Sequence, residues 1–250
     1  MSFTIQATDD YTNDIKLDPS CQLPESASSI KWLSNPAMPI FASTCWDKSL
    51  RIFEVTQTPN GPGIYQKMMT TLNTVPLTTC WNADCSALYI GCMDGTIKLF
   101  DINTQSMNDI GKHNASVCSI SYVPQQNVLI TSAYENNIHF WQGGPNPVFS
   151  VDVMNKVYAS DYKNGVLAGG TANEKIFFID MATVTSGTKT ILDSVDLGKF
   201  SQIESIALDN KAETIGVATV DGRANISTLS RAGNGFKMNP IITFKANKQE

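Results

Sequence analysis

Short runs of alternating apolar and polar residues cover most of the chain, and one arrangement of them recurs. Residues 42–55, ASTCWDKSLRIFEV, consist of an apolar run, an acidic turn and a second alternating run. The same shape returns in residues 89–102, 130–142, 168–181 and 216–229. Alternation with a period of two is typical of β-strands, and no segment longer than about ten residues keeps a helical period. The pattern predicts an all-β chain.

An acidic or amide side chain occupies the turn in each copy of this shape. These turn residues are Asp47, Asp94, Glu135, Asn173 and Asp221. They recur about every 40 to 45 residues, and this period with four short strands per unit is typical of β-propeller blades. A short carboxylate at a turn accepts hydrogen bonds from nearby backbone N–H groups. We therefore expect Asp47, Asp94 and Asp221 to be blade-turn acids with a structural role.

Five units of this kind follow a lead-in at residues 1–26. The units cover about 27–74, 75–114, 115–154, 155–200 and 201–250. Each unit opens with an alternating segment, continues with the two runs around the turn and closes with a more polar fourth segment. The Pro- and Gly-rich stretches TPNGPG and QGGPNP interrupt the runs and are typical of loops.

The composition narrows the class of protein. Hydrophobic residues make up 42% of the 250 residues and charged residues 16%, with a net charge of −5 and a pI near 5.0. This balance argues against a broad nucleic-acid groove, so any RNA contact is expected to be local or indirect. We see no signal-peptide pattern, and no apolar run approaches the roughly 18 residues of a membrane span. The sequence predicts a soluble chain.

The residues that carry chemistry in other proteins are sparse here. The chain has no Cys-x-x-Cys pair, and its two histidines, His113 and His139, are not paired at ligand spacing, so we expect no metal and no cofactor. It also lacks a glycine-rich phosphate loop and a Gly-x-Ser-x-Gly elbow. A catalytic interpretation of His113 with Thr131 or Glu135 is weaker than a neutral histidine that orients a loop. We therefore expect no enzyme activity. The cysteines, expected to be reduced and buried, are Cys21, Cys45, Cys80, Cys85, Cys92 and Cys118.

The third unit contains a specific set of polar residues. His113 precedes its first strand, Thr131 lies in the second, Glu135 is at the turn, and Trp141 follows Glu135 by six positions in the third strand. This set resembles the WD-repeat family, whose His, Ser/Thr, Asp and Trp form a buried hydrogen-bonded tetrad. The resemblance implies a β-propeller and a structural role for the four residues.

The other units match the tetrad less completely. The tryptophan position is occupied by Phe53 in the first unit and by Phe100 in the second. The chain departs from the family pattern at Ile90, where Ser or Thr is usual, at Asn173 and at Ser227. We expect the blades that contain these three residues to lack the tetrad.

Longer segments resemble two sister families of WD-repeat proteins. The segments SSIKWL…FASTCWDKSLRIFEV, KHNASVCSISYVPQQNVLITSAYENNIHFW, VYASDYKNGVLAGGTANEKIFFIDM and VATVDGRANISTL are similar, in this order, to the first, third, fourth and fifth repeats of both. One family contains the mRNA-export factors of the nuclear pore (the Rae/Gle type), the other the mitotic-checkpoint propellers (the Bub type). The long loop TQTPNGPGIYQKMM and the segment NDIKL favour the export type. The checkpoint type and another scaffold propeller remain alternatives.

The resemblance implies an adaptor of the nucleus, the nuclear pore and the cytoplasm. Both sister families hold a short hairpin-forming segment, called GLEBS, of a larger partner across the propeller face. The partner is a nucleoporin in one family and a checkpoint kinase in the other. Because such a segment carries acidic residues, the basic Arg223 and Lys48 are candidate partner-binding residues, with Arg223 aligned to a salt-bridging arginine of the family. Trp46 is a third candidate, which would stack on the partner, with packing inside the blade as the alternative. Arg51 is a weaker candidate, since a charged strand residue is usually only solvated.

The same resemblance leads us to expect an incomplete ring. Propellers of these families have seven blades, and their N-terminal strand completes the last one. Five units and one lead-in strand at residues 13–17 leave seven of 28 strands unaccounted for. The fold class expected from the sequence is therefore an all-β WD-repeat propeller with five recognisable blades of seven, incomplete at the C-terminus.

Overall fold

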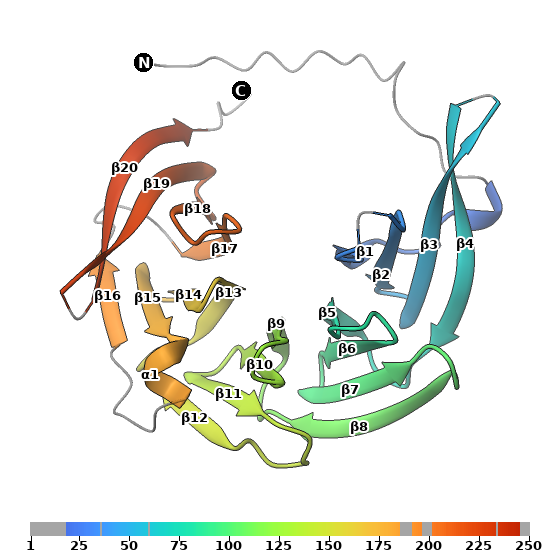
Figure 1. Ribbon diagram of the computed structural model, residues 1–250, viewed down its shortest axis with the longest axis horizontal. Coiled ribbons are helices and arrows are strands. Elements are labelled where there is room, and N and C mark those ends of the chain that lie inside the picture. Colours follow the sequence, from blue (N-terminus) through green and yellow to red (C-terminus); the bar gives the residue numbers. More distant parts are fainter. Residues whose placement is uncertain are drawn as a thin grey trace.

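The computed structural model describes residues 19–35, 37–59, 61–185, 192–196, 202–233 and 235–245. Within these ranges the chain forms five antiparallel sheets of four strands each, which follow one another along the sequence (Figure 1). This architecture confirms the all-β propeller class expected from the alternating runs. The expected strand at residues 13–17 lies outside the described residues.

The first three sheets are simple up-and-down meanders. The first contains β1 (Ala27–Trp32), β2 (Ile40–Cys45), β3 (Ser49–Thr58) and β4 (Gly61–Thr71). The second contains β5 (Pro76–Trp81), β6 (Ala87–Cys92), β7 (Thr96–Asp101) and β8 (Ser106–Lys112). The third contains β9 (Val117–Val123), β10 (Val128–Ala133), β11 (Asn137–Trp141) and β12 (Phe149–Asp152).

The last two sheets repeat the same order of strands. The fourth contains β13 (Val157–Lys163), β14 (Val166–Thr171), β15 (Lys175–Asp180) and β16 (Leu192–Asp196). The fifth contains β17 (Ile203–Leu208), β18 (Thr214–Thr219), β19 (Arg223–Ala232) and β20 (Gly235–Lys245). The two short helices of the described chain are η1 (Pro19–Cys21) and α1 (Met181–Thr185). No helix in the described ranges is long and apolar enough to cross a membrane.

The five sheets stand side by side around a common centre. Their first strands contact one another in sequence order, β1 with β5, β5 with β9, β9 with β13 and β13 with β17. Figure 1 shows these strands at the inside of an arc and the fourth strands at its outside, with an opening between the first and the fifth sheet. Neighbouring chain segments therefore form neighbouring sheets.

Apolar side chains fill the space between adjacent sheets. One cluster, which includes Leu50, Leu88 and Phe100, joins the first two sheets, and another, with Ile97 and Trp141, joins the second and third. Two further clusters join the third to the fourth sheet and the fourth to the fifth. Because each strand exposes side chains on both faces, the buried face of one sheet covers that of the next.

The turn between the second and third strand has a repeated backbone geometry in the first, second, fourth and fifth sheets. Gly95 and Gly222 have φ values of 84° and 78°, and Lys48 and Glu174 hold the same left-handed conformation at 66° and 67°. Gly95 is also constrained by space, because an added Cβ would lie 2.4 Å from the carbonyl oxygen of His113. The side chain before the glycine assists the turn, since Asp94 Oδ1 accepts a hydrogen bond from Thr96 N at 3.0 Å.

Candidate functional site

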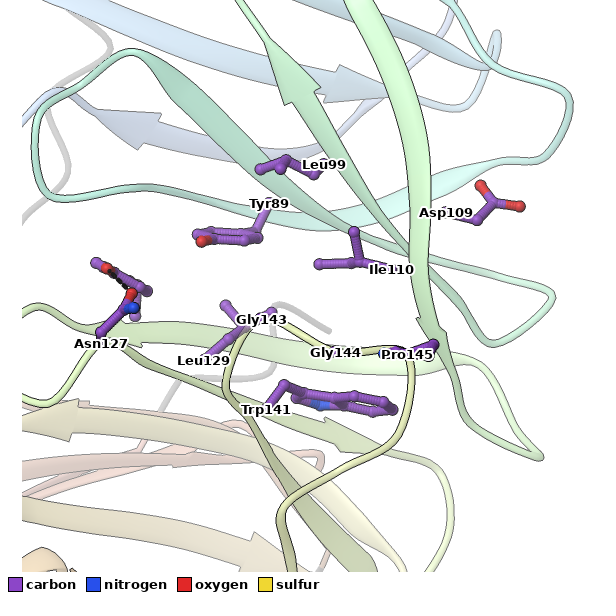
Figure 2. Close-up of a pocket in the computed structure, with 11 residues that line it drawn as sticks. Tyr89, Leu99, Asp109, Ile110, Asn127, Leu129, Trp141, Gly143, Gly144 and Pro145 are labelled. Carbon is purple, nitrogen blue, oxygen red and sulfur yellow. Dashed lines mark hydrogen bonds between the residues drawn. The ribbon is translucent and has the colours of Figure 1, made fainter.

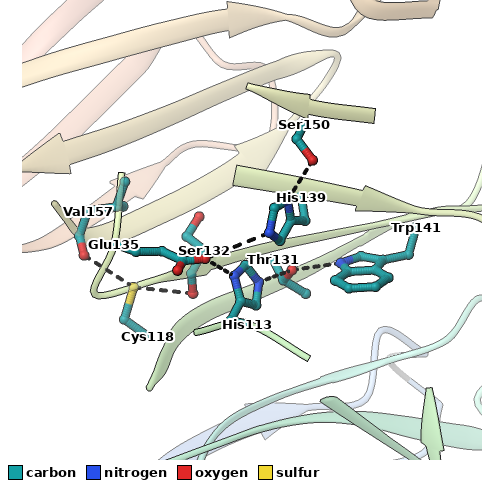
Figure 3. A network of polar contacts seen from close by, with 9 residues as sticks. All are labelled: His113, Cys118, Thr131, Ser132, Glu135, His139, Trp141, Ser150 and Val157. Atoms are coloured by element: carbon teal, nitrogen blue, oxygen red, sulfur yellow. Dashed lines mark hydrogen bonds and ion pairs between the residues drawn. The ribbon is translucent and has the colours of Figure 1, made fainter. Parts of the chain in front are cut away.

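A chain of polar contacts runs through the third sheet (Figure 3). The Nδ1 atom of His113 lies 2.6 Å from Glu135 Oε1, and its Nε2 atom lies 2.7 Å from Thr131 Oγ1. Trp141 donates from Nε1 to the same Thr131 oxygen at 2.8 Å. The structure thus brings together the four residues that the sequence spacing singled out in this unit.

The hydrogen-bond pattern favours a neutral His113. Thr131 Oγ1 accepts the Trp141 N–H, so its own hydrogen is available to His113 Nε2, and His113 Nδ1–H then donates to Glu135. In this arrangement every group has a partner. Burial lowers the pKa of His113, although the hydrogen bond with Glu135 acts in the opposite direction. His113 and Thr131 are both buried.

His139 is a residue of this network that sequence reasoning missed. Its ring stacks on that of His113 with centroids 4.4 Å apart, and its Nε2 lies 3.7 Å from Glu135 Oε1. Its Nδ1 lies 2.7 Å from Ser150 Oγ on β12. The expectation that the two histidines are not paired at ligand spacing is therefore wrong, because donor atoms of His113, Glu135 and His139 all lie within 4.8 Å of one another.

The sequence did contain a signal for this placement. Residues 139 and 141 are two apart on β11, so alternation puts their side chains on one face of the sheet. His139 is also paired in register with Thr131 on β10. These types of residue could hold a metal ion, but both ring nitrogens of His113 already have partners, Nδ1 with Glu135 and Nε2 with Thr131.

The first sheet replaces this network by an ion pair. Asp47 Oδ2 lies 2.8 Å from Arg51 Nη2, and Asp47 Oδ1 accepts a hydrogen bond from Ser49 N at 2.9 Å. Burial alone would raise the pKa of Asp47, but the hydrogen bonds from Ser49 and Arg51 outweigh it and lower the pKa. The Arg51 side chain is only 7% exposed. The expectation that Arg51 is merely solvated is wrong, because β4 covers it and Asp47 neutralises it.

The turn acids of the second and fifth sheets have different partners. Asp94 caps its own turn, whereas the cation four residues later, Lys98, pairs with Asp109 on β8 at 2.5 Å. Asp221 accepts a hydrogen bond from Thr219 Oγ1 at 2.6 Å and lies 3.0 Å from Arg223 Nε. Arg223 therefore stands directly beside the turn acid of its own sheet.

All these turns lie at the same end of the sheets, which we call the upper face. It is the end where the second strand turns into the third and where the chain links one sheet to the next. Backbone hydrogen bonds tie the links to the turns, as from Leu72 N to Lys48 O and from Val157 N to Glu135 O. Lys48 is exposed on this face in the first sheet, and Arg223, the first residue of β19, lies at the same end of the fifth sheet.

A set of apolar side chains is exposed on the upper face at equivalent positions. Each residue directly follows the second strand of its sheet and precedes the turn acid, and each is between 41% and 59% exposed. These residues are Trp46, Met93, Tyr134 and Val220. Sequence reasoning identified only Trp46. The signal for the others was their position immediately before Asp94, Glu135 and Asp221.

Comparisons with known proteins agree with this architecture. Residues 69–101 and 105–142 match the family model of the WD domain, G-beta repeat. The Poly(A)+ RNA export protein of Schizosaccharomyces pombe is 25% identical over 232 residues, which are 90% of this chain and 63% of that protein. Protein Rae1 of Drosophila melanogaster is 27% identical over 190 residues, which are 74% of this chain and 54% of that protein.

The sister family is also represented. The mitotic checkpoint protein bub-3 of Caenorhabditis elegans is 23% identical over 226 residues, which are 89% of this chain and 63% of that protein. The chain thus spans between 54% and 63% of the length of these curated relatives. The resemblance inferred from the sequence is confirmed. Two segments of the chain match the WD repeat, its five sheets are arranged as in a β-propeller, and it is similar to mRNA-export factors of the Rae/Gle type and, next to them, to checkpoint proteins of the Bub type.

Proposed function

We propose that the protein is a non-enzymatic adaptor that binds a GLEBS-type segment of a nucleoporin and acts in mRNA export from the nucleus. The observation that carries the proposal is the similarity, over 90% of the chain, to a protein named for poly(A)+ RNA export. A second relative, of Chaetomium thermophilum, is named mRNA export factor GLE2 and matches the same share of the chain. Such an adaptor works at the nuclear pore, in the nucleus and in the cytoplasm.

The upper face has the properties that this partner requires. Its exposed apolar residues, Trp46 among them, offer contact area for a peptide laid across several sheets. Lys48 and Arg223 add positive charge for acidic side chains of the peptide. A guanidinium carries five N–H donors, so a partner carboxylate can share Arg223 with Asp221 or displace it.

The polar network of the third sheet supports an adaptor over an enzyme. The hydroxyl that could act as a nucleophile, that of Thr131, is buried and accepts the Trp141 N–H. A nucleophile must instead reach its substrate. These four residues therefore stabilise a blade in our proposal.

The test is a titration of the full chain with synthetic peptides. A nucleoporin GLEBS segment is expected to bind, and Arg223→Glu is expected to weaken it at least about thirtyfold, since truncating a buried ion pair costs about 2–5 kcal/mol. The matched control is Lys237→Glu, a charge reversal at an exposed residue of β20 near the opposite end of the same sheet. Equal binding by wild type and Arg223→Glu would remove Arg223 from the site.

The checkpoint function is a second candidate because of the bub-3 relative. A GLEBS segment of a checkpoint kinase, used as competitor in the same titration, separates the two. Preference for the nucleoporin peptide supports export, and preference for the kinase peptide supports the checkpoint role. If neither peptide binds, the adaptor proposal is wrong.

A further inference from the structure

A pocket of about 470 Å³ lies between the second and the third sheet (Figure 2). The second sheet contributes Tyr89, Leu99 and Ile110, and the third sheet contributes Leu129 and Trp141. In Figure 2 the first three side chains face the last two across the space. This volume falls within the range of about 300–1,000 Å³ that is typical of ligand sites.

The pocket lies towards the end of the sheets that is opposite to the upper face. Its lining includes Asn127, in the turn between β9 and β10, and Gly143, Gly144 and Pro145, in the loop that follows β11. Turns of these two kinds lie opposite to the turns between second and third strands, because consecutive strands are antiparallel. A segment bound in the pocket therefore leaves the upper face accessible.

The interior of the pocket is uncharged. Among the described residues that line it, Asp109 is the only charged one, and in Figure 2 its carboxylate points away from the space. Asp109 pairs instead with Lys98, which alternates with Leu99 along β7 and so lies on the other face of the second sheet. A charged group would lose its hydration in the pocket without gaining a partner, so the lining selects an uncharged occupant.

The preceding junction, between the first and the second sheet, shows what fills the corresponding space there. Phe100 on β7 corresponds to Trp141 on β11, because each is paired with the second residue of the strand before it. Ile102 comes two residues after Phe100, and Met107 on β8 is paired with Phe100. Both Ile102 and Met107 pack against the apolar cluster of this junction. Two apolar side chains therefore close the space between the first two sheets.

The third sheet lacks counterparts of these two side chains. The residue two positions after Trp141 is Gly143, where an added Cβ would meet no atom within 4 Å. The pairing of β12 with β11 stops at Phe149, opposite Phe140, so no paired strand residue stands opposite Trp141. The pocket thus lies where this junction is short of two apolar side chains that the preceding junction contains.

Two polar groups at one end of the pocket are available to a peptide backbone. Tyr122 Oη donates to Asn127 Oδ1 at 2.7 Å and stacks on Tyr89, with centroids 5.4 Å apart. The amide Nδ2 of Asn127 and the hydroxyl of Tyr89 form no hydrogen bond with any residue that the structure describes. An amide donates to a carbonyl, and a hydroxyl both donates and accepts. These groups favour a peptide over a hydrocarbon, which forms no hydrogen bonds.

We propose that this pocket binds a short uncharged segment of a partner protein through two neighbouring apolar side chains. These side chains take the places that Ile102 and Met107 take in the preceding junction, and they pack on Trp141 and Ile110. Each of them removes apolar surface from water on both partners. The Nδ2 group of Asn127 donates to a backbone carbonyl of the segment. The site is separate from the peptide site proposed on the upper face.

The experiment is a selection of displayed random heptapeptides on the wild-type chain, after depletion of the library on Ile110→Trp. Ile110 is partly buried and its side chain points into the space in Figure 2, so an indole at this position fills the pocket. Circular dichroism and a thermal melt establish that the variant is folded, and Leu99→Trp replaces it if it is not. We expect the enriched peptides to share two neighbouring residues from Leu, Ile and Met, with no common charged residue.

One enriched peptide, fluorescently labelled, is then titrated with the chain. Serine in place of either apolar residue should lower the affinity at least about tenfold, because a buried aliphatic side chain is lost. Tyr89→Phe removes only the hydroxyl and should lower the affinity about two- to tenfold. The matched control is Lys112→Trp, at an exposed residue of the other end of β8, which should bind the peptide as the wild type does.

The proposal fails if no peptide is enriched after the depletion, or if the enriched peptides share no pair of apolar residues. It also fails if the serine-substituted peptides bind as tightly as the original. Loss of binding in Lys112→Trp would place the peptide near the upper face and would likewise overturn the proposal. A nucleoporin GLEBS peptide is expected to bind Ile110→Trp as it binds the wild type, so failure here leaves the proposed adaptor function untouched.

Discussion

Replacement of Thr131 by valine is expected to destabilise the protein by about 2–5 kcal/mol. Valine keeps the shape of threonine, so packing in β10 is preserved. The change removes the oxygen that joins His113 Nε2 at 2.7 Å and Trp141 Nε1 at 2.8 Å. Both nitrogens are then buried without a partner, and each such group costs about 1–3 kcal/mol.

The first sheet offers a matched control at the equivalent position. Ser43 lies four residues before Asp47, as Thr131 lies four before Glu135. Its Oγ is buried and has no hydrogen-bond partner among the described residues. Ser43→Ala is therefore expected to be neutral or to stabilise the protein by up to about 1 kcal/mol, because it removes an unpaired polar group.

The two variants are compared by urea unfolding at pH 7.5, followed by circular dichroism and tryptophan fluorescence. If both probes report the same unfolding transition, the unfolding is two-state and the midpoints of the variants can be compared. The opposite signs of the two effects are the signature of the network. If Thr131→Val and Ser43→Ala shift the midpoint by the same small amount, the contacts in the third sheet contribute no net stability and the reasoning fails.

Three further outcomes are expected. Arg51→Ala should cost about 3–5 kcal/mol, because it leaves Asp47 as an uncompensated half-buried charge, and a thermal melt equal to wild type would contradict this. Trp141→Ala should cost about 3–5 kcal/mol through lost packing between the second and third sheets, measured by urea unfolding. Burial lowers the pKa of both His113 and His139, so the unfolded chain binds more protons as the pH falls through its histidine pKa near 6.5. Stability should thus be complete above that pH and decrease below it. The double variant His113→Gln, His139→Gln measures the part of the pH dependence that comes from the carboxylates. If the urea midpoint of the wild type changes between pH 7.5 and 5.5 only as much as that of the double variant, the expectation is refuted.

The sequence by itself determined the architecture of this protein. Alternation along a strand and the turn chemistry of Asp94 with Gly95 depend only on residues close together in the chain. Repetition of that local pattern was therefore enough to predict four-stranded units around a common centre. The resemblance of the third unit to the WD repeat also pointed to His113, Thr131, Glu135 and Trp141, and hydrogen bonds join these four side chains in the structure.

Only the tertiary structure decided the surroundings of the individual side chains. Arginine is charged and is therefore usually exposed, and the burial of Arg51 depends on β4 folding over it. The stacking of His139 on His113 and the pairing of Lys98 with Asp109 depend on contacts between strands and links whose distance no local pattern encodes. The pocket beside Trp141 likewise depends on the angle between the second and the third sheet, and the packing of these two sheets determines that angle. Local rules specify the backbone, while burial and charge partners emerge only when the sheets assemble.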